Sequence, residues 1–200
     1  MSDTPDNRHQ ARMARKKALI DANIARAGDE RGLLIVLTGN GKGKSTSAFG
    51  MVARALGHGM KVGVAQFIKS RTDTGEEAFF RRQPGVEWHV LGDGFTWDTQ
   101  DREQDIATAR RGWEVAQRML ADPSFGLVVL DELTYLLSYG YLEQDAVLDA
   151  IAARPSMQHV VVTGRGAPQA LVDLADTVSE IADRKHAYRA GVKAQKGVDL

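Results

Sequence analysis

The stretch LLIVLTGNGKGKST (residues 33–46) constrains the fold of this chain more than any other part of its sequence. It opens with a continuous uncharged run, which is typical of a strand buried inside a parallel sheet. The loop that follows is rich in glycine and lysine and precedes a helical pattern. Its backbone N–H groups can therefore converge on an anion at a helix N-terminus. We expect a buried strand, a phosphate-binding loop and a helix in direct succession.

The residues of this loop predict how phosphates would be held. Its three glycines carry no Cβ, so the backbone can approach phosphate oxygens closely. Lys44 would neutralise phosphate charge, and Ser45 would place its hydroxyl on Mg²⁺. Thr38 stands where the pattern G-x-x-x-x-G-K-[ST] has its first glycine, so the strict pattern is not met. The predicted ATP-binding residues here are Gly39, Asn40, Gly41, Lys42, Gly43, Lys44, Ser45 and Thr46.

From residue 33 onward, strand-like and helix-like segments alternate. Strands are expected at 33–38, 61–68, 86–91, 126–132, 158–165 and, at a sheet edge, 177–182. Helices are expected at 44–56, from about 104 to 121, at 144–153 and at 168–175, with a polar loop at 69–77 before a short helical piece. This repetition predicts an α/β fold, a mostly parallel sheet with helices on both faces, and ligands beyond the carboxyl ends of its strands.

Asp131 and Glu132 end the apolar strand GLVVLDE. Carboxylates at this point can reach Mg²⁺ directly or through water, so both residues are candidate metal ligands together with Ser45. The alternative is a pair of solvated acids that begins a loop. With the phosphate loop, the pair predicts a P-loop NTPase architecture of the RecA-like kind, in which a second acid often orients an attacking water.

Residues 1–28 are basic and differ from the P-loop α/β domain expected at 29–200. Met13, Ile20 and Ile24 follow helical spacing, which predicts a weakly amphipathic helix. It is either a solvated, partly frayed arm or a lid that orders on a ligand. The segment has no apolar core of the signal-peptide kind, and no run approaches the roughly 18–20 apolar residues of a membrane span.

Charge and cysteine content narrow the function classes. The formal net charge is zero, which argues against a nucleic-acid partner or a membrane surface. The chain contains no cysteine, so thiol catalysis and disulfides are excluded. We expect a cytoplasmic protein.

The loop GDGFTWDTQDRE (92–103) follows a strand and therefore lies at the ligand end of the sheet. Phe95 and Trp97 are two residues apart, which puts both rings on one side of an extended segment. They either fold back into the core or form a hydrophobic platform for a large flat ligand.

Six stretches together resemble one family, the ATP:corrinoid adenosyltransferases of the phosphate-loop type. They are TGNGKGKST, GHGMKVGVAQFIK, GFTWDTQDRE, VVLDELTY, VVTGRG and KHAYRAGVKAQKGVDL. The resemblance implies that Co(I) of a reduced corrinoid attacks C5′ of ATP and that inorganic triphosphate leaves, with Mg²⁺ or Mn²⁺ as the metal. The phosphate loop would then hold the leaving group rather than a group to be transferred.

The resemblance also implies residue roles. Lys44 would be catalytic, Phe95 and Trp97 would be catalytic by displacing the lower cobalt ligand, and Arg165 would join them in binding the corrinoid. Arg54, in the helix after the loop, would lie near the nucleotide. The N-terminal helix would close over the substrates, a flavodoxin-like reductase would deliver the electron, and the chain would form a homodimer. Where the family usually has FIKGxWxxGE, this chain reads FIKSRTDTGE, so no site is assigned there.

Two other functions stay open at this point. A RecA-like P-loop ATPase would release ADP and phosphate instead of triphosphate. A nucleotide-binding module without catalysis would bind ATP and not turn it over.

Overall fold

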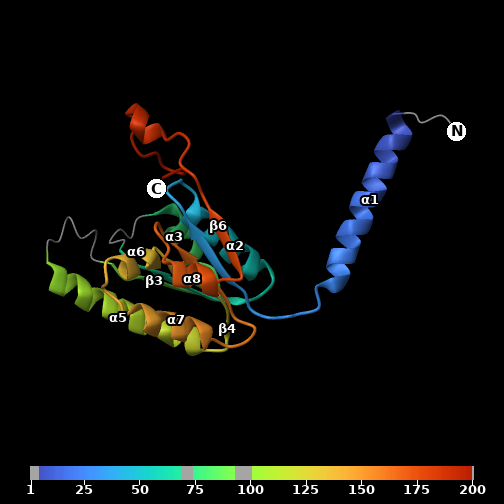
Figure 1. Cartoon of the computed structure of the whole chain (residues 1–200). Helices are drawn as coiled ribbons and strands as arrows, with labels where there is room; N and C mark the ends of the chain where they lie inside the picture. Colours follow the sequence, from blue (N-terminus) through green and yellow to red (C-terminus); the bar gives the residue numbers. More distant parts are fainter. Residues whose placement is uncertain (1–4, 69–73, 93–100, 200) are drawn as a thin grey trace. The chain divides into compact units, whose positions relative to one another are not determined.

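The structure is a computed structural model that describes residues 5–68, 74–92 and 101–199 (Figure 1). The chain divides into two compact units, Met1–Arg31 and Gly32–Leu200. The first unit contains the helix α1 (Pro5–Arg26), which carries exposed apolar side chains at Met13, Ile20 and Ile24. This is the helix that the spacing of the apolar residues predicts.

The second unit is built on a six-stranded sheet in the order β3-β2-β4-β5-β1-β6, and every pair of neighbours is parallel. The predicted α/β architecture is therefore confirmed, with β6 at an edge as expected. The strand β5 lies between β1, which precedes the phosphate loop, and β4, which ends in the acids. The strands are β1 (Leu34–Thr38), β2 (Lys61–Gln66), β3 (Val86–Val90), β4 (Phe125–Asp131), β5 (His159–Thr163) and β6 (Thr177–Glu180).

Helices cover both faces of this sheet. The strand residues alternate between two apolar clusters, one on each face, and each cluster includes helix residues. Val128 and Leu130 belong to the cluster that includes helices α5 to α8, whereas Leu127 and Val129 pack on the side of α2. The helices are α2 (Lys44–Gly57), α3 (Gly75–Phe80), α5 (Arg102–Ala121), α6 (Leu133–Ser138), α7 (Gln144–Ala152) and α8 (Gln169–Leu174). A short 3₁₀ helix, Ala187–Ala190, lies in the tail after β6.

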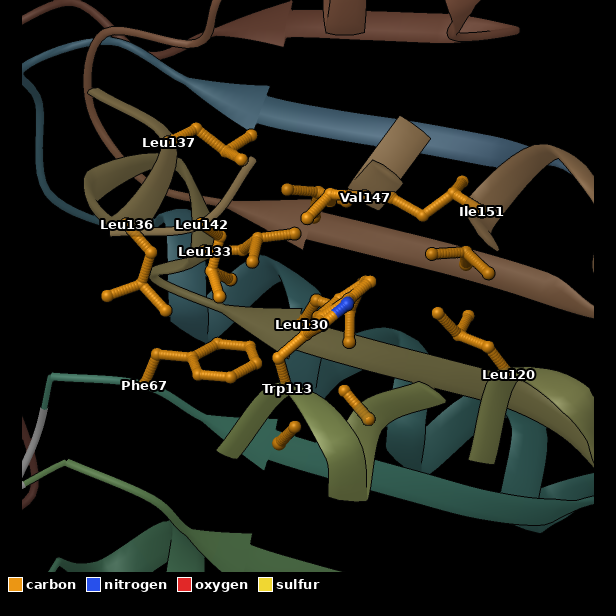
Figure 2. Packing of buried hydrophobic residues seen from close by; sticks show 14 of the residues in the cluster. Phe67, Trp113, Leu120, Leu130, Leu133, Leu136, Leu137, Leu142, Val147 and Ile151 are labelled. Atoms are coloured by element: carbon orange, nitrogen blue, oxygen red, sulfur yellow. The ribbon is translucent and has the colours of Figure 1, made fainter. Parts of the chain in front are cut away.

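The larger cluster covers one face of the sheet along the length of β4 (Figure 2). Leu130 of β4 lies among side chains from α5, α6 and α7 and is fully buried. Burial of this many large side chains contributes most of the stability of the unit, at about 1.5–3 kcal/mol for each. The labelled members are Phe67, Trp113, Leu120, Leu130, Leu133, Leu136, Leu137, Leu142, Val147 and Ile151.

Two local predictions were wrong. The expected loop at 69–77 is too long, because Thr74 caps α3 by accepting a hydrogen bond from the Glu77 N–H, so Gly75 to Glu77 are helical. The helix α6 was not predicted. It is a single short apolar segment whose side chains enter the core, and it offers too few residues for a helical period to show.

Candidate nucleotide site

A pocket of about 520 Å³ opens at the carboxyl ends of β1, β4 and β5. It lies where a doubly covered parallel sheet is expected to bind ligands. The phosphate loop forms one side, and segments from the rest of the second unit form the others. The lining residues are Asn40, Gly41, Lys42, Gly43, Lys44, Ser45, Thr46, Phe49, Gly75, Glu76, Glu132, Arg165, His186, Gly197, Val198 and Asp199.

The glycines of the loop serve two different purposes. Gly43 adopts φ +120°, a conformation that residues with side chains rarely adopt, and a Cβ there would meet no atom within 4 Å. A Cβ on Gly41 would instead lie 2.6 Å from the carbonyl oxygen of Ala182, and the Gly41 N–H donates to the Ile181 oxygen at 2.7 Å. Gly39 meets Ile181 in the same way, with φ +94° and a Cβ position 2.5 Å from the same oxygen. The chain leaving β6 therefore supports the loop from outside the pocket.

Lys44 is the first residue of α2 and is only 7% exposed. Its Nζ donates to the Gly41 carbonyl oxygen at 2.9 Å, so the ammonium group is held over its own loop. Burial lowers the pKa of Lys44, Arg165 lowers it further, and the carboxylates of Glu132 and Asp131 oppose both effects. A phosphate in this pocket would favour the charged form of Lys44 strongly.

The two acids after β4 occupy different environments. Glu132 lines the pocket and is held at φ +63°, in the left-handed region that costs a residue with a side chain about 1–3 kcal/mol. Asp131 is fully buried and is not among the pocket-lining residues. Its Oδ1 accepts from the Thr163 hydroxyl at 2.7 Å and its Oδ2 from the Gln66 amide at 3.0 Å. The geometry therefore favours Glu132 over Asp131 as a metal ligand.

Arg165 lies in the Gly-Arg-Gly turn after β5 and lines the pocket. Its carbonyl oxygen accepts from the Thr134 hydroxyl at 2.7 Å, which ties the turn to the start of α6. Gly164 has φ +138°, and a Cβ there would lie 2.0 Å from the same hydroxyl. Only glycine permits this close approach, so the turn and the acid-bearing segment share one fixed geometry.

Among the described residues, three predicted site residues do not line this pocket: Gly39, Arg54 and Asp131. Arg54 lies in the last turn of α2 with an exposed side chain and does not line the pocket. Ten residues at about 1.5 Å each put it roughly 15 Å along the helix from Lys44. Phe95 and Trp97 lie outside the described residues.

The structure adds lining residues that the sequence patterns did not indicate. Phe49 and Glu76 enter from α2 and α3. Gly75 of α3 and four residues of the tail also line the pocket, and one of these, Asp199, pairs with Lys42 of the loop at 2.9 Å. This hydrogen bond is the main reason that the pKa of Asp199 is lowered. Asp199 lies in KHAYRAGVKAQKGVDL, one of the stretches that carry the resemblance, but no role was assigned to it there.

The donor groups fit a divalent metal that arrives with a nucleotide. Among the residues that the structure describes, no group of three or more His, Asp or Glu side chains is arranged to hold an ion alone. The pocket nevertheless contains Ser45, Glu76 and Glu132 beside the phosphate loop. Mg²⁺ in nucleotide sites is usually bound through one or two carboxylates plus phosphate oxygens and water.

A phosphate loop between β1 and α2, with an acid beyond β4, defines a P-loop nucleotide-binding protein of the α/β class. Sequence comparison narrows this class. The chain belongs to the family ATP:corrinoid adenosyltransferase BtuR/CobO/CobP, whose model matches residues 30–200. A second model, cob(I)alamin adenosyltransferase N terminal, matches residues 1–24. The resemblance indicated by the six sequence motifs is confirmed.

Similar proteins extend over the whole chain. A corrinoid adenosyltransferase of Pseudomonas aeruginosa is 64% identical over 203 residues and covers 100% of both chains. A corrinoid adenosyltransferase of Escherichia coli K12 is 54% identical, over 97% of this chain and 98% of the relative. Corrinoid adenosyltransferase CobA of Salmonella typhimurium is 53% identical with the same coverage. None of these names indicates an ATPase, so the RecA-like ATPase alternative is not favoured.

Proposed function

We propose that this protein transfers the 5′-deoxyadenosyl group of ATP to the cobalt of a reduced corrinoid, in cobalamin biosynthesis or salvage. The observation that carries the proposal is the family membership, which extends from the N-terminal segment to the last residues. The pocket supports it, because Lys44 and the loop amides form a cradle for a chain of phosphates.

The reaction assigns a specific task to the phosphate loop. Co(I) supplies the electron pair of the new cobalt–carbon bond, the C5′–O bond breaks, and its pair leaves on the oxygen of inorganic triphosphate. No general base is needed, because the nucleophile is already formed. Lys44 and the loop N–H groups would stabilise the charge that develops on the leaving oxygen. Mg²⁺, held near Ser45 and Glu132, would supply further charge neutralisation when bound.

The corrinoid side of the site rests on the resemblance. Phe95 and Trp97 would lie under the corrin ring and displace its lower ligand, which makes Co(II) easier to reduce. Arg165 would contact the corrinoid or the nucleotide from the turn after β5, where it already lines the pocket.

The remaining expectations are also proposals. We propose that residues 1–28 act as a lid, supported by the exposed apolar side chains of α1. A homodimer, a flavodoxin-like electron donor and a cytoplasmic location follow from the family resemblance. Within the described ranges, none of the helices combines the length and apolar character needed to cross a membrane.

The test is a single anaerobic reaction of the protein with ATP, Mg²⁺ and chemically reduced corrinoid. A light-sensitive alkylcobalt spectrum with stoichiometric triphosphate is expected. An unchanged corrinoid spectrum with ADP and phosphate would show an ATPase instead. ATP binding without any product would show a binding module. Lys44→Ala should lower the rate by about 100-fold or more if the loop stabilises the leaving group.

A further inference from the structure

A chain of buried hydrogen bonds crosses four neighbouring strands and ends at the backbone of Glu132, which lines the pocket. The Trp88 indole N–H donates to the Gln66 Oε1 at 3.0 Å, and the Gln66 amide donates to Asp131. On the other side, the Thr163 hydroxyl donates to Asp131 and accepts from the Glu132 N–H at 2.9 Å. The contributing strands are β3, β2, β4 and β5, which are adjacent in the sheet.

Every side chain in this chain of hydrogen bonds is shielded from water. Thr163 and Asp131 have no exposed surface, Gln66 is 1% exposed and Trp88 is 5% exposed. Buried polar groups are costly unless they are paired, and a fully paired network holds its members in one arrangement. The network therefore holds the backbone of Glu132 in one position beside the pocket.

Thr163 is the member that acts on the site. Its hydroxyl has a single proton, which goes to Asp131, so an oxygen lone pair faces the backbone N–H of Glu132. Glu132 is the residue in the left-handed conformation, and this hydrogen bond anchors its backbone. Asp131 fixes the direction of the hydroxyl and lies outside the pocket lining.

We propose that Thr163 is a positioning residue that aims Glu132 at the metal–nucleotide complex, and that Asp131 serves this network instead of binding the metal directly. The inference rests on the proposed function only in assuming that the pocket binds ATP with a divalent metal. It requires no corrinoid chemistry.

The test measures ATP affinity by calorimetry as a function of Mg²⁺, without corrinoid. Thr163→Val keeps the side-chain shape and removes the hydroxyl, and it should raise the half-saturating Mg²⁺ concentration by about 10- to 100-fold. ATP affinity in the presence of a chelator should stay near that of the wild type. Thr163→Ser restores the hydroxyl and should restore the Mg²⁺ response. Thr163→Ala is measured in parallel, because it also lacks the hydroxyl and can replace Thr163→Val if that variant does not fold.

Gln158→Leu is the control. Gln158 is buried just before β5, at the end opposite Thr163, and its amide donates to the carbonyl oxygens of Met119 and Asp122, both at 3.1 Å. This variant should lose stability without a change in the half-saturating Mg²⁺ concentration. The double variant Asp131→Asn/Thr163→Val should raise the half-saturating Mg²⁺ concentration no further than the more severe single variant does, because both substitutions break the same hydrogen-bond network.

Four results would overturn the inference. Three concern the variants: an unchanged Mg²⁺ response in the Thr163 variants that lack the hydroxyl, equal increases in half-saturating Mg²⁺ in Thr163→Ser and Thr163→Val, or additive increases in the Asp131 double variant. The fourth is a wild-type ATP affinity that does not depend on Mg²⁺. Mg²⁺-dependent ATP binding without adenosyl transfer would contradict only the proposed function.

Discussion

Gly41→Ala tests whether the chain leaving β6 shapes the phosphate loop. Gly41 is buried, and the new Cβ would lie 2.6 Å from the Ala182 oxygen and 2.7 Å from the Ile181 oxygen. Ordinary contact begins at 3.4 Å, so the loop or the facing backbone must move by about 0.8 Å. Neither neighbour is a flexible side-chain end that could move aside at little cost.

The expected loss of stability follows from these contacts. Movement of the loop breaks the 2.7 Å hydrogen bond from the Gly41 N–H to the Ile181 oxygen, which costs about 1 kcal/mol. Overpacking against backbone adds about 1–3 kcal/mol. The free energy of unfolding should therefore fall by about 2–4 kcal/mol, which lowers Tm by roughly 5–15 °C in a chain of this size. Misplacement of the loop amides should slow the reaction by up to about 100-fold.

Gly50→Ala provides the control, since Gly50 is an exposed residue within α2 with no atom within 4 Å of its Cβ position. Alanine favours the helix there by about 0.5–1 kcal/mol, so Tm should rise slightly and ATP affinity should not change. Differential scanning calorimetry and ATP titration measure both variants. If Gly41→Ala kept the Tm and ATP affinity of the wild type, the reasoning on the β6 contact would be refuted.

Other predictions concern charge and the aromatic loop. Burial lowers the pKa of Lys44 below 10.5, so the unfolded state binds more protons between the lowered pKa and 10.5. The stability of the wild type relative to Lys44→Met should therefore rise with pH in this window, as measured by denaturant unfolding; a flat difference would contradict it. Asp199→Asn frees Lys42 for phosphate and should tighten ATP binding by roughly two- to fivefold at low salt, with less effect at high salt. Weaker binding would show that Asp199 assists the nucleotide. Trp97→Ala should impair turnover more with Co(II) corrinoid and mild reductant than with preformed Co(I), and equal losses would remove the lower-ligand argument.

The features that the sequence predicted correctly are local. The phosphate loop follows a buried strand and opens a helix, and each of these signals lies within fifteen residues of the others. The parallel sheet follows in turn from the repetition of such units. The short helix α6 was missed because it has only six residues, four of which are buried beside others from distant segments, so no regular spacing marks it.

The distinction between Asp131 and Glu132 depends on tertiary structure. Asp131 ends β4 inside the sheet, where Gln66 and Thr163 complete its hydrogen bonds from neighbouring strands. Glu132 turns toward the pocket because its backbone is left-handed, which no sequence pattern of acidic residues indicates. Arg54 does not line the pocket for a simpler reason, since the rise of the helix separates it from Lys44.

Because the chain after β6 supports the phosphate loop, the loop loses less conformational freedom when it binds a nucleotide. Gly39 and Gly41 are pressed against Ile181 and Ala182, so their missing side chains make room for the protein's own backbone. The backbone amides that follow Gly41 are then available to face the phosphates, and the φ of +120° at Gly43 sets their direction. A loop held in this way requires little ordering when a nucleotide arrives. For the proposed reaction this matters most at the transition state, because an attack on C5′ needs the leaving triphosphate to be held in line while charge develops on its oxygen.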